Sequence, residues 1–260
     1  MEIKDTALRA VKKAGLLLKE NISRAHRVDY KSAVDIVTEM DTKAEALIMD
    51  EIRRDFPDHG ILTEESPEIK SATGRRWIID PLDGTTNYAH GFPVFCVSVA
   101  FEDKGRVLFG AVYNPMLGEL FTGEKGKGAY LNGARIRVSS VAALDKSLLA
   151  TGFPYDIRVS EHKNLDHFSN FAVKAQAIRR AGSAALDLSY VACGRFDGFW
   201  EMKLKPWDTA AAALFVREAG GVLTDFKGEG FDMNMSECLA SNGLIHKEML
   251  DVLMKGVSKN

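Results

Sequence analysis

The stretch 77–87 has the sequence WIIDPLDGTTN and contains two carboxylates, Asp80 and Asp83, that could take part in chemistry. Its apolar start predicts a short buried strand that ends at Asp80 and the proline after it. Gly84 permits a close approach of the backbone, and Thr85 can begin a helix whose first N–H groups bind an anion. Such a group of residues is suited to holding a metal-bound phosphate. The same residues also suit an ordinary turn, and the local pattern supports both interpretations equally.

Asp41 lies upstream, directly before a helix that the spacing of apolar residues predicts over 42–54. Thr42 and Glu45 have the spacing of a capping box, in which each side chain bonds the backbone N–H of the other residue. A lone aspartate at this position is more typical of a helix start than of a catalytic residue. Because Thr42 is expected to fill the cap, Asp41 remains available for chemistry.

Further candidates lie in the second half of the chain. Asp208 stands at the start of a helix predicted over 207–219, where an aspartate usually caps the helix. Glu201 follows a short predicted strand, and a solvated charge at a strand end explains it as well as a binding role does. Residues 182–184 are small enough to line a pocket, but they also suit the start of the helix predicted over 184–193.

Helices, hairpins and crossovers must position these residues. The expected helices cover 8–22, 42–54, 164–174, 184–193, 207–219 and 247–254. The expected strands cover 77–79, 94–101, 107–113, 120–121, 129–131, 136–138, 177–178, 198–200, 222–224 and 239–241, with a hairpin turn at Asn132-Gly133. This mixture predicts an α/β (α+β layered) fold with alternating sheets and helices. No linker or repeat divides the chain, so we expect a single domain over 1–260, with at most a soft boundary near Leu144.

Composition excludes several classes of protein. The 260 residues are 46% hydrophobic and 27% charged with a net charge of −2, which excludes a disordered chain and argues against direct binding of nucleic acid. The three cysteines form no C-x-x-C pair, so neither a disulfide framework nor a zinc site is expected. The residues at the start of the given sequence lead us to expect no secretory signal, and glycine, histidine and proline interrupt the longest uncharged stretch, 84–101. We therefore expect a cytoplasmic protein without a membrane span.

Four motifs in a fixed order connect this chain with a known family. They are 34–41 (VDIVTEMD), 62–66 (LTEES), 80–87 (DPLDGTTN) and 207–221 (WDTAAAALFVREAGG). In these motifs the chain resembles the inositol monophosphatase family of magnesium-dependent, lithium-sensitive phosphatases, and the similarity extends over most of its length. The resemblance implies the layered fold of the inositol monophosphatase/fructose-1,6-bisphosphatase type. It also implies a homodimer.

The resemblance assigns roles to individual residues. The implied ligands of magnesium, for two or three ions per site, are Glu64, Asp80, the Leu82 carbonyl, Asp83 and Asp208. The implied substrate contacts are Asp83, Gly84, Thr85, Gly182, Ser183, Ala184, Glu201 and Asp208. Glu64 and Thr85 would orient and deprotonate the attacking water, and Asp41 would support Thr85. Oxygen donors suit Mg²⁺, a hard cation, whereas the six scattered histidines do not.

The implied reaction is direct hydrolysis of the phosphate monoester of a polyol by a water that magnesium activates, without a phosphoenzyme. The expected substrate is myo-inositol 1-phosphate, and fructose-1,6-bisphosphate phosphatase activity is the alternative. Some bacterial relatives assist the transcription machinery, so a mainly non-catalytic partner role is a further alternative. Two positions bear on the site. Thr63 stands where the family commonly has glycine, which would shift the loop carrying Glu64, and Lys31 resembles a loop lysine of the family.

Overall fold

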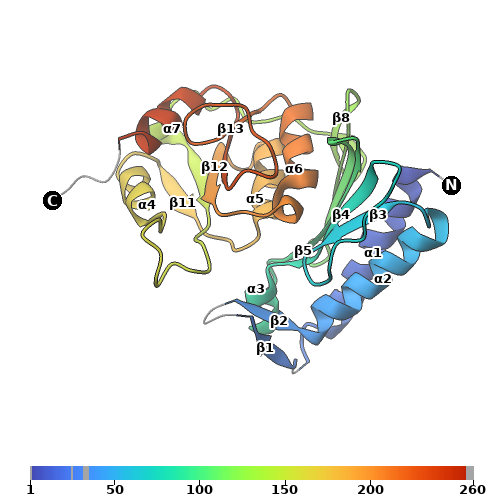
Figure 1. Cartoon of the computed structure of the whole chain (residues 1–260). Helices are drawn as coiled ribbons and strands as arrows, with labels where there is room; N and C mark the ends of the chain where they lie inside the picture. Colours follow the sequence, from blue (N-terminus) through green and yellow to red (C-terminus); the bar gives the residue numbers. More distant parts are fainter. Residues whose placement is uncertain (1, 25, 32–34, 256–260) are drawn as a thin grey trace.

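Two β-sheets alternate with layers of helices in the computed structural model (Figure 1). Helices α1 and α2 cover the outer face of the larger sheet, α5 and α6 lie between the sheets, and α4 and α7 cover the smaller sheet. The structure describes residues 2–24, 26–31 and 35–255, so Val34 in the first motif lies outside the described residues. The expected α/β layered fold is confirmed.

The larger sheet has seven strands in the order β3-β4-β5-β6-β7-β8-β9. Their bounds are β3 Gly60–Thr63, β4 Arg75–Asp83, β5 Cys96–Asp103, β6 Arg106–Asn114, β7 Glu119–Glu124, β8 Gly128–Leu131 and β9 Ala134–Arg135. β3 and β4 are parallel, whereas the later neighbours are antiparallel. The turn at Asn132-Gly133 is confirmed, with positive φ angles of 50° and 82°. The strand predicted at 136–138 was wrong, because the pairing ends at Arg135.

The end of β4 differs from the prediction made from the sequence. The strand does not end at Asp80 but continues through Pro81 to Asp83, with a shift of register against β5 between the two aspartates. Proline cannot donate to the sheet, and an irregularity of this kind accommodates it within a strand. The same irregularity lets both aspartates lie at the end of one strand.

The smaller sheet has five strands in the order β11-β10-β12-β14-β13. Their bounds are β10 Leu148–Thr151, β11 Ala177–Arg179, β12 Gly198–Met202, β13 Val222–Thr224 and β14 Glu237–Ser241. A separate hairpin joins β1 Val28–Tyr30 to β2 Ile36–Thr38. Leu144 lies in a short 3₁₀ helix, Leu144–Lys146, on the connection between the two sheets. The extent of the single domain stays a prediction.

Seven α-helices are present among the described residues. Their bounds are α1 Ile3–Asn21, α2 Glu39–Asp55, α3 Thr85–Ala89, α4 Leu165–Ala172, α5 Ala184–Ala192, α6 Pro206–Glu218 and α7 His246–Leu253. The predicted capping box of Thr42 and Glu45 was wrong. α2 begins at Glu39, its N-cap is Thr38, and Asp41 itself completes the box by accepting from Thr38 N at 2.8 Å. Because β2 leads directly into α2, the helix begins earlier than its apolar spacing indicated.

Alternate residues of β4 connect two hydrophobic clusters. Trp77 and Ile79 pack in the cluster under α1 and α2, whereas Ile78 packs in the cluster under α5 and α6. Successive side chains of a strand point to opposite faces, so a strand covered by helices on both faces is apolar throughout. Burial on both faces fixes the position of the aspartates at the end of β4. No helix among the described residues is long and apolar enough to cross a membrane.

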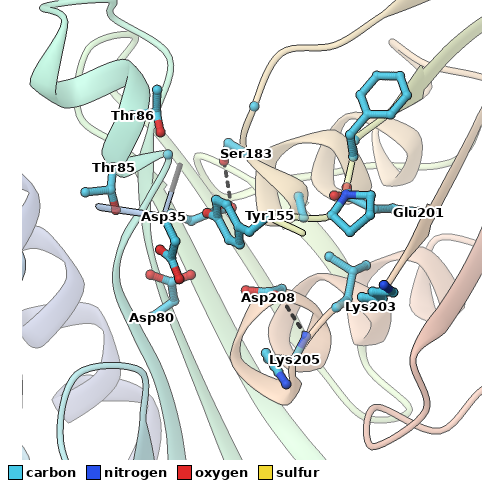
Figure 2. A pocket seen from close by; sticks show the side chains of 18 of the residues that line it. Asp35, Asp80, Thr85, Thr86, Tyr155, Ser183, Glu201, Lys203, Lys205 and Asp208 are labelled. Atoms are coloured by element: carbon cyan, nitrogen blue, oxygen red, sulfur yellow. Dashed lines mark hydrogen bonds between the residues drawn. The ribbon is translucent and has the colours of Figure 1, made fainter. Parts of the chain in front are cut away.

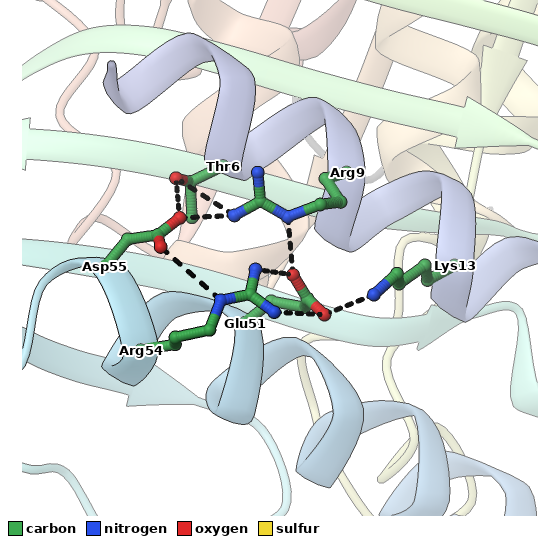
Figure 3. Close-up of polar contacts among 6 residues, drawn as sticks. All are labelled: Thr6, Arg9, Lys13, Glu51, Arg54 and Asp55. Carbon is green, nitrogen blue, oxygen red and sulfur yellow. Dashed lines mark hydrogen bonds and ion pairs between the residues drawn. The ribbon is translucent and has the colours of Figure 1, made fainter. Parts of the chain in front are cut away.

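An ion cluster joins α1 to α2 on the outer side of the larger sheet (Figure 3). Its members are Thr6, Arg9, Lys13, Glu51, Arg54 and Asp55. Arg9 Nε and Lys13 Nζ each lie 2.5 Å from a Glu51 oxygen. Burial would raise the pKa of Glu51, but hydrogen bonds from Lys13, Arg9 and Arg54 outweigh it and lower that pKa to about 2. The opposite charges of this cluster therefore stabilise the packing of the two helices.

Candidate active site

A cleft of about 300 Å³ lies where residues of both sheets and of α3, α5 and α6 come together (Figure 2). All five proposed metal ligands, four carboxylates and one backbone carbonyl, line it together with the small residues predicted to contact substrate. From the predicted set, the lining residues are Glu64, Asp80, Leu82, Asp83, Gly84, Thr85, Gly182, Ser183, Ala184, Glu201 and Asp208. The fold thus gathers residues from five distant segments of the chain.

The end of β4 supplies two carboxylates that differ in their hydrogen bonds. Asp80 is 2% exposed and accepts from Leu82 N at 3.0 Å. Asp83 accepts from Ser183 Oγ and from Ala185 N, both at 2.7 Å. Burial raises the pKa of both, with the neighbouring carboxylates adding to the rise for Asp80, and the hydrogen bonds limit the pKa of Asp83 to about 6. Asp83 therefore links β4 directly to the start of α5.

Gly84 is required by its surroundings. Its φ angle of 107° lies in the left-handed region, and a Cβ at this position would lie 2.9 Å from the Val94 carbonyl oxygen. A residue with a side chain would therefore be strained and would push against the backbone. Glycine permits the sharp change of direction that places α3 directly after β4.

Thr85 connects the cleft to Asp41. The Thr85 hydroxyl lies 2.8 Å from Asp41 Oδ1 and 3.0 Å from the Leu82 carbonyl oxygen, so it can donate to either acceptor. Burial raises the pKa of Asp41, whereas hydrogen bonds from Thr38 and Thr85 lower it in part. Asp41 is fully buried and does not line the cleft, so it can act on a substrate only through Thr85.

Glu45 holds the loop that carries Glu64. The Glu45 carboxylate is 2% exposed and accepts from Thr63 Oγ1 at 2.6 Å, from Glu65 N at 3.0 Å and from Ser66 Oγ. Thr63 is therefore bonded in place, and its hydroxyl helps to fix the loop. Glu45 was predicted as a helix cap, whereas in the structure it supports the cleft.

Glu64 faces the cleft beside Lys31. Burial raises the pKa of Glu64 to about 8, the nearby Lys31 opposes the rise, and Glu65 and Asp41 add to it. Lys31 Nζ lies 3.4 Å from a Glu64 oxygen and 2.6 Å from a Glu65 oxygen. The lysine thus partly neutralises the carboxylates of this loop.

Asp208 both caps a helix and lines the cleft. It accepts from Lys205 N at 2.6 Å at the start of α6, as expected for a cap. Its pKa is raised well above the ordinary value by burial and by Asp83, Glu64 and Glu201. Burial also raises the pKa of Glu201 to about 8, against the opposing effect of Arg180. Both carboxylates are half-buried and line the cleft.

The sequence analysis missed other residues of the cleft. Asp187, Arg180, Tyr155, Lys203 and Lys205 also line it. Asp187 is the one charged residue of α5, a helix of mostly apolar residues. This contrast in the sequence could have identified it as a candidate. Tyr155 and the lysines lie in irregular segments whose sequence gives no comparable sign.

The donors that face the cleft suit a metal ion in type but are not drawn together around one. Among residues 2–24, 26–31 and 35–255, no three His, Cys, Asp or Glu side chains lie close enough together to hold an ion as they stand. The donors facing the cleft are nevertheless carboxylates and a carbonyl, as a hard divalent cation prefers. Burial, and to a lesser extent repulsion among these carboxylates, raises their pKa values, and a bound cation would relieve the repulsion. The residues therefore fit such an ion chemically.

Comparisons with known proteins cover nearly the whole chain. The sequence model of the Inositol monophosphatase family matches residues 1–259. The protein named Nus factor SuhB of Escherichia coli K12 is 45% identical over 247 residues, which cover 94% of this chain and 92% of that protein. The protein named inositol-1-monophosphatase of Synechocystis is 44% identical over 251 residues, which cover 96% of this chain and 88% of that protein.

A solved structure extends the likeness to the fold. The crystal structure of the extragenic suppressor protein suhB from Bartonella henselae superposes with a TM-score of 0.92 at 40% sequence identity. The match covers 98% of this chain and 99% of that chain. The layered fold implied by the four motifs is therefore confirmed over almost the full length.

Proposed function

Because the chain belongs to the inositol monophosphatase family, whose members are phosphatases, we propose that it hydrolyses the phosphate monoester of a polyol, with myo-inositol 1-phosphate as the expected substrate. The observation that carries this proposal is the convergence of Glu64, Asp80, Asp83 and Asp208 on one cleft. We further propose that the protein is a lithium-sensitive, cytoplasmic homodimer.

Mg²⁺ is the proposed cofactor, with two or three ions per site. Its proposed ligands are Glu64, Asp80, the Leu82 carbonyl, Asp83 and Asp208. When bound, magnesium neutralises negative charge on the phosphate and makes a water molecule more acidic. The raised pKa values of the free carboxylates mean that ion binding displaces protons, so the affinity for Mg²⁺ should increase with pH.

The side chains divide the remaining work. The Thr85 hydroxyl donates a hydrogen bond to Asp41 or to the Leu82 carbonyl. The lone pairs of its oxygen are then available to orient the attacking water. Glu64 accepts a proton from that water as the water oxygen bonds to phosphorus. The bond between phosphorus and the ester oxygen breaks, and this leaving oxygen takes a proton from solvent to become a hydroxyl. Gly84 leaves room for the phosphate near the backbone, and residues 182–184 and Glu201 contact the polyol. The products are inorganic phosphate and the free polyol.

Phosphate release tests this proposal. We expect release from myo-inositol 1-phosphate to require Mg²⁺, to fall when Li⁺ is added and to exceed release from fructose 1,6-bisphosphate. Asp83→Asn should lower kcat/KM by at least about 10²-fold, because it removes a charge facing the reacting group. The control Asp58→Asn changes an exposed aspartate and should leave kcat/KM unchanged. Retained Mg²⁺-dependent turnover in Asp83→Asn would refute the assignment of this residue. If the wild-type protein released phosphate from neither substrate, the proposed substrate class would be refuted.

A second candidate function comes from the Escherichia coli relative, which is named a Nus factor. We propose as the alternative that this chain acts mainly as a partner of the transcription machinery. A strain carrying only Asp83→Asn separates the two functions, provided that the variant protein is present at its normal level. A wild-type phenotype despite lost phosphatase activity would favour the partner function, whereas the phenotype of a deletion would favour catalysis.

A further inference from the structure

Asp187 is a buried carboxylate of the cleft to which neither the four motifs nor the proposed reaction gives a role. It lies in the first turns of α5, four residues after the Ser183 cap that bonds Asp83. It is 1% exposed and lines the cleft. Its backbone N–H donates to the Ser183 carbonyl, as expected within a helix. Its side chain thus adds a polar group to the wall of the cleft.

One carboxylate oxygen of Asp187 lacks a hydrogen-bond partner within the described part of the chain, where other buried aspartates have one. Its Oδ1 is enclosed and has no donor among the described residues. By contrast, Asp83 has Ser183 and Ala185 as donors, and Asp197, which lies outside the cleft, has Ser139 Oγ at 2.5 Å and Leu148 N at 2.7 Å. A buried polar atom without a partner is costly, so such an atom beside a binding cleft indicates that a ligand supplies the partner.

The neighbours of Asp187 indicate the kind of ligand. Burial raises its pKa well above the ordinary value, Glu201 and Asp83 add to the rise, and Arg180 opposes it. Glu201 reaches the cleft beside Gly152, where a Cβ would lie 2.0 Å from Glu201 Oε1. An alcohol hydroxyl both donates and accepts, so it can bond a carboxyl in either protonation state. A second anion would be repelled, and an apolar group would leave the carboxyl unpaired.

We propose that Asp187 is a specificity-determining residue that, together with Glu201, binds hydroxyl groups of the polyol and so selects polyol phosphates over monoesters without such hydroxyls. This inference rests on the function proposed above. It assigns Asp187 to the leaving-group end of the substrate and gives it no part in the transfer of the phosphate. Removing its carboxyl should therefore change discrimination between substrates more than it changes the rate for a substrate without hydroxyls.

A pair of substrates tests the assignment. We would measure kcat/KM for myo-inositol 1-phosphate and for p-nitrophenyl phosphate, which has no hydroxyl on its leaving group, at saturating Mg²⁺. Asp187→Ala should lower kcat/KM for the inositol ester by about 10- to 100-fold, the usual effect of losing a hydrogen bond to a charged or buried group. The value for p-nitrophenyl phosphate should stay within about 2-fold. Asp187→Asn should have a smaller effect, because its amide keeps one donor and one acceptor.

Analogues of the substrate make the test specific. Each analogue lacks one ring hydroxyl. Loss of the hydroxyl that Asp187 binds should lower kcat/KM in the wild-type protein but leave it unchanged in Asp187→Ala. Such a cycle isolates the contact from a general effect on the fold. The control Asp197→Asn removes a buried charge outside the cleft, so it should lower the midpoint of thermal unfolding while leaving the preference for the inositol ester unchanged.

Two results would overturn the inference alone. One is an equal loss on both substrates in folded Asp187→Asn, which would indicate a structural role. The other is an unchanged preference in both Asp187 variants of an enzyme whose wild type hydrolyses the inositol ester. A wild-type protein that hydrolyses p-nitrophenyl phosphate but not the inositol ester would overturn the proposed substrate as well, so the two failures are distinguishable.

Discussion

The cleft and the ion cluster between α1 and α2 are both rich in buried or half-buried carboxylates, yet their charges are arranged in opposite ways. In the ion cluster, Arg9, Lys13 and Arg54 surround Glu51 and lower its pKa to about 2. In the cleft, carboxylates face one another, and burial and repulsion raise the pKa of Glu64 to about 8. The first region supplies its own counter-charges, whereas in the second Lys31 and Arg180 oppose the rise in the pKa of Glu64 and of Glu201 without cancelling it.

The difference shows how one chain can use the same residue type for stability and for binding. Neighbouring opposite charges favour the folded state, because the carboxylates are ionised more readily there than in the unfolded chain. Like charges in the cleft oppose folding at neutral pH, and the cost is relieved when a cation binds. A region that is unfavourable by itself is thus ready for a ligand of opposite charge.

The largest expected effect comes from reducing the repulsion in the cleft. Asp80→Asn should lower kcat/KM by at least about 10²-fold, because Asp80 is a proposed ligand of the cofactor. It should also raise the midpoint of thermal unfolding without metal, since one of the repelling carboxylates is gone. Added Mg²⁺ should stabilise the variant less than the wild type. Thermal unfolding with and without Mg²⁺, with Asp58→Asn as control, checks this, and a destabilised metal-free variant would contradict the proposed repulsion.

A smaller effect on activity is expected when the loop that carries Glu64 loses its support. Glu45→Ala removes the acceptor of Thr63, Glu65 and Ser66 and should raise the Mg²⁺ concentration for half-maximal activity by about 10-fold, as losses of such supporting groups do. Isothermal titration with Mg²⁺ measures the affinity without turnover. The control Glu102→Gln loosens a buried pair with Arg76 outside the cleft and should leave that affinity unchanged. An unchanged Mg²⁺ affinity in Glu45→Ala would show that the loop holds its position without Glu45.

The smallest effect on activity is expected in the ion cluster. Glu51→Gln should lower the free energy of unfolding by about 1–3 kcal/mol at pH 7, because three cations lose their shared anion, while kcat stays unchanged. The control Glu124→Gln breaks an exposed pair with Lys127 and should cost less than about 0.5 kcal/mol. Urea unfolding gives both values, and a change in kcat for Glu51→Gln would contradict the separation of the two regions.

The pH dependence of the Glu51→Gln difference follows from the sign of the shift. The pKa of Glu51 is lowered on folding, so its contribution is present above the unfolded value of about 4.3 and is lost as the pH falls toward about 2. Urea unfolding of the wild type and of Glu51→Gln at pH 7 and pH 3 should therefore give a smaller difference at the lower pH.

Much of the fold could be predicted from local patterns. The period of apolar residues indicated α5 and α6 almost to their ends, since an amphipathic or buried helix carries its own signal. It also indicated the end of α1 but not its start, which lies at Ile3 and not at Leu8. The end of β4 and the start of α2 were wrong, because a sheet irregularity and an adjoining strand decided them. The short strands β3 and β10 were missed, since a few apolar residues do not distinguish a strand from other buried segments.

The candidate site divides in the same way. Asp80, Asp83 and Thr85 stood out because they lie together in one motif, and their common cleft is part of the structure. Whether the predicted ligands bind magnesium stays a prediction. Glu45 was interpreted as a cap and Asp187 was not singled out, since the importance of each depends on partners far away in the sequence: the loop 63–66 for Glu45, and Glu201 and Arg180 for Asp187.

The sequence by itself determined the residue types, their order in four motifs and the apolar patterns that make helices and strands. These are local properties, set by side-chain size, backbone preference and period. Only the tertiary structure decided that carboxylates from β4, from the loop after β3 and from α6 face a single cleft, while Glu51 and Asp55 of α2 meet the cations of α1. Electrostatic energy depends on distance and burial, and both are fixed only when distant segments pack together.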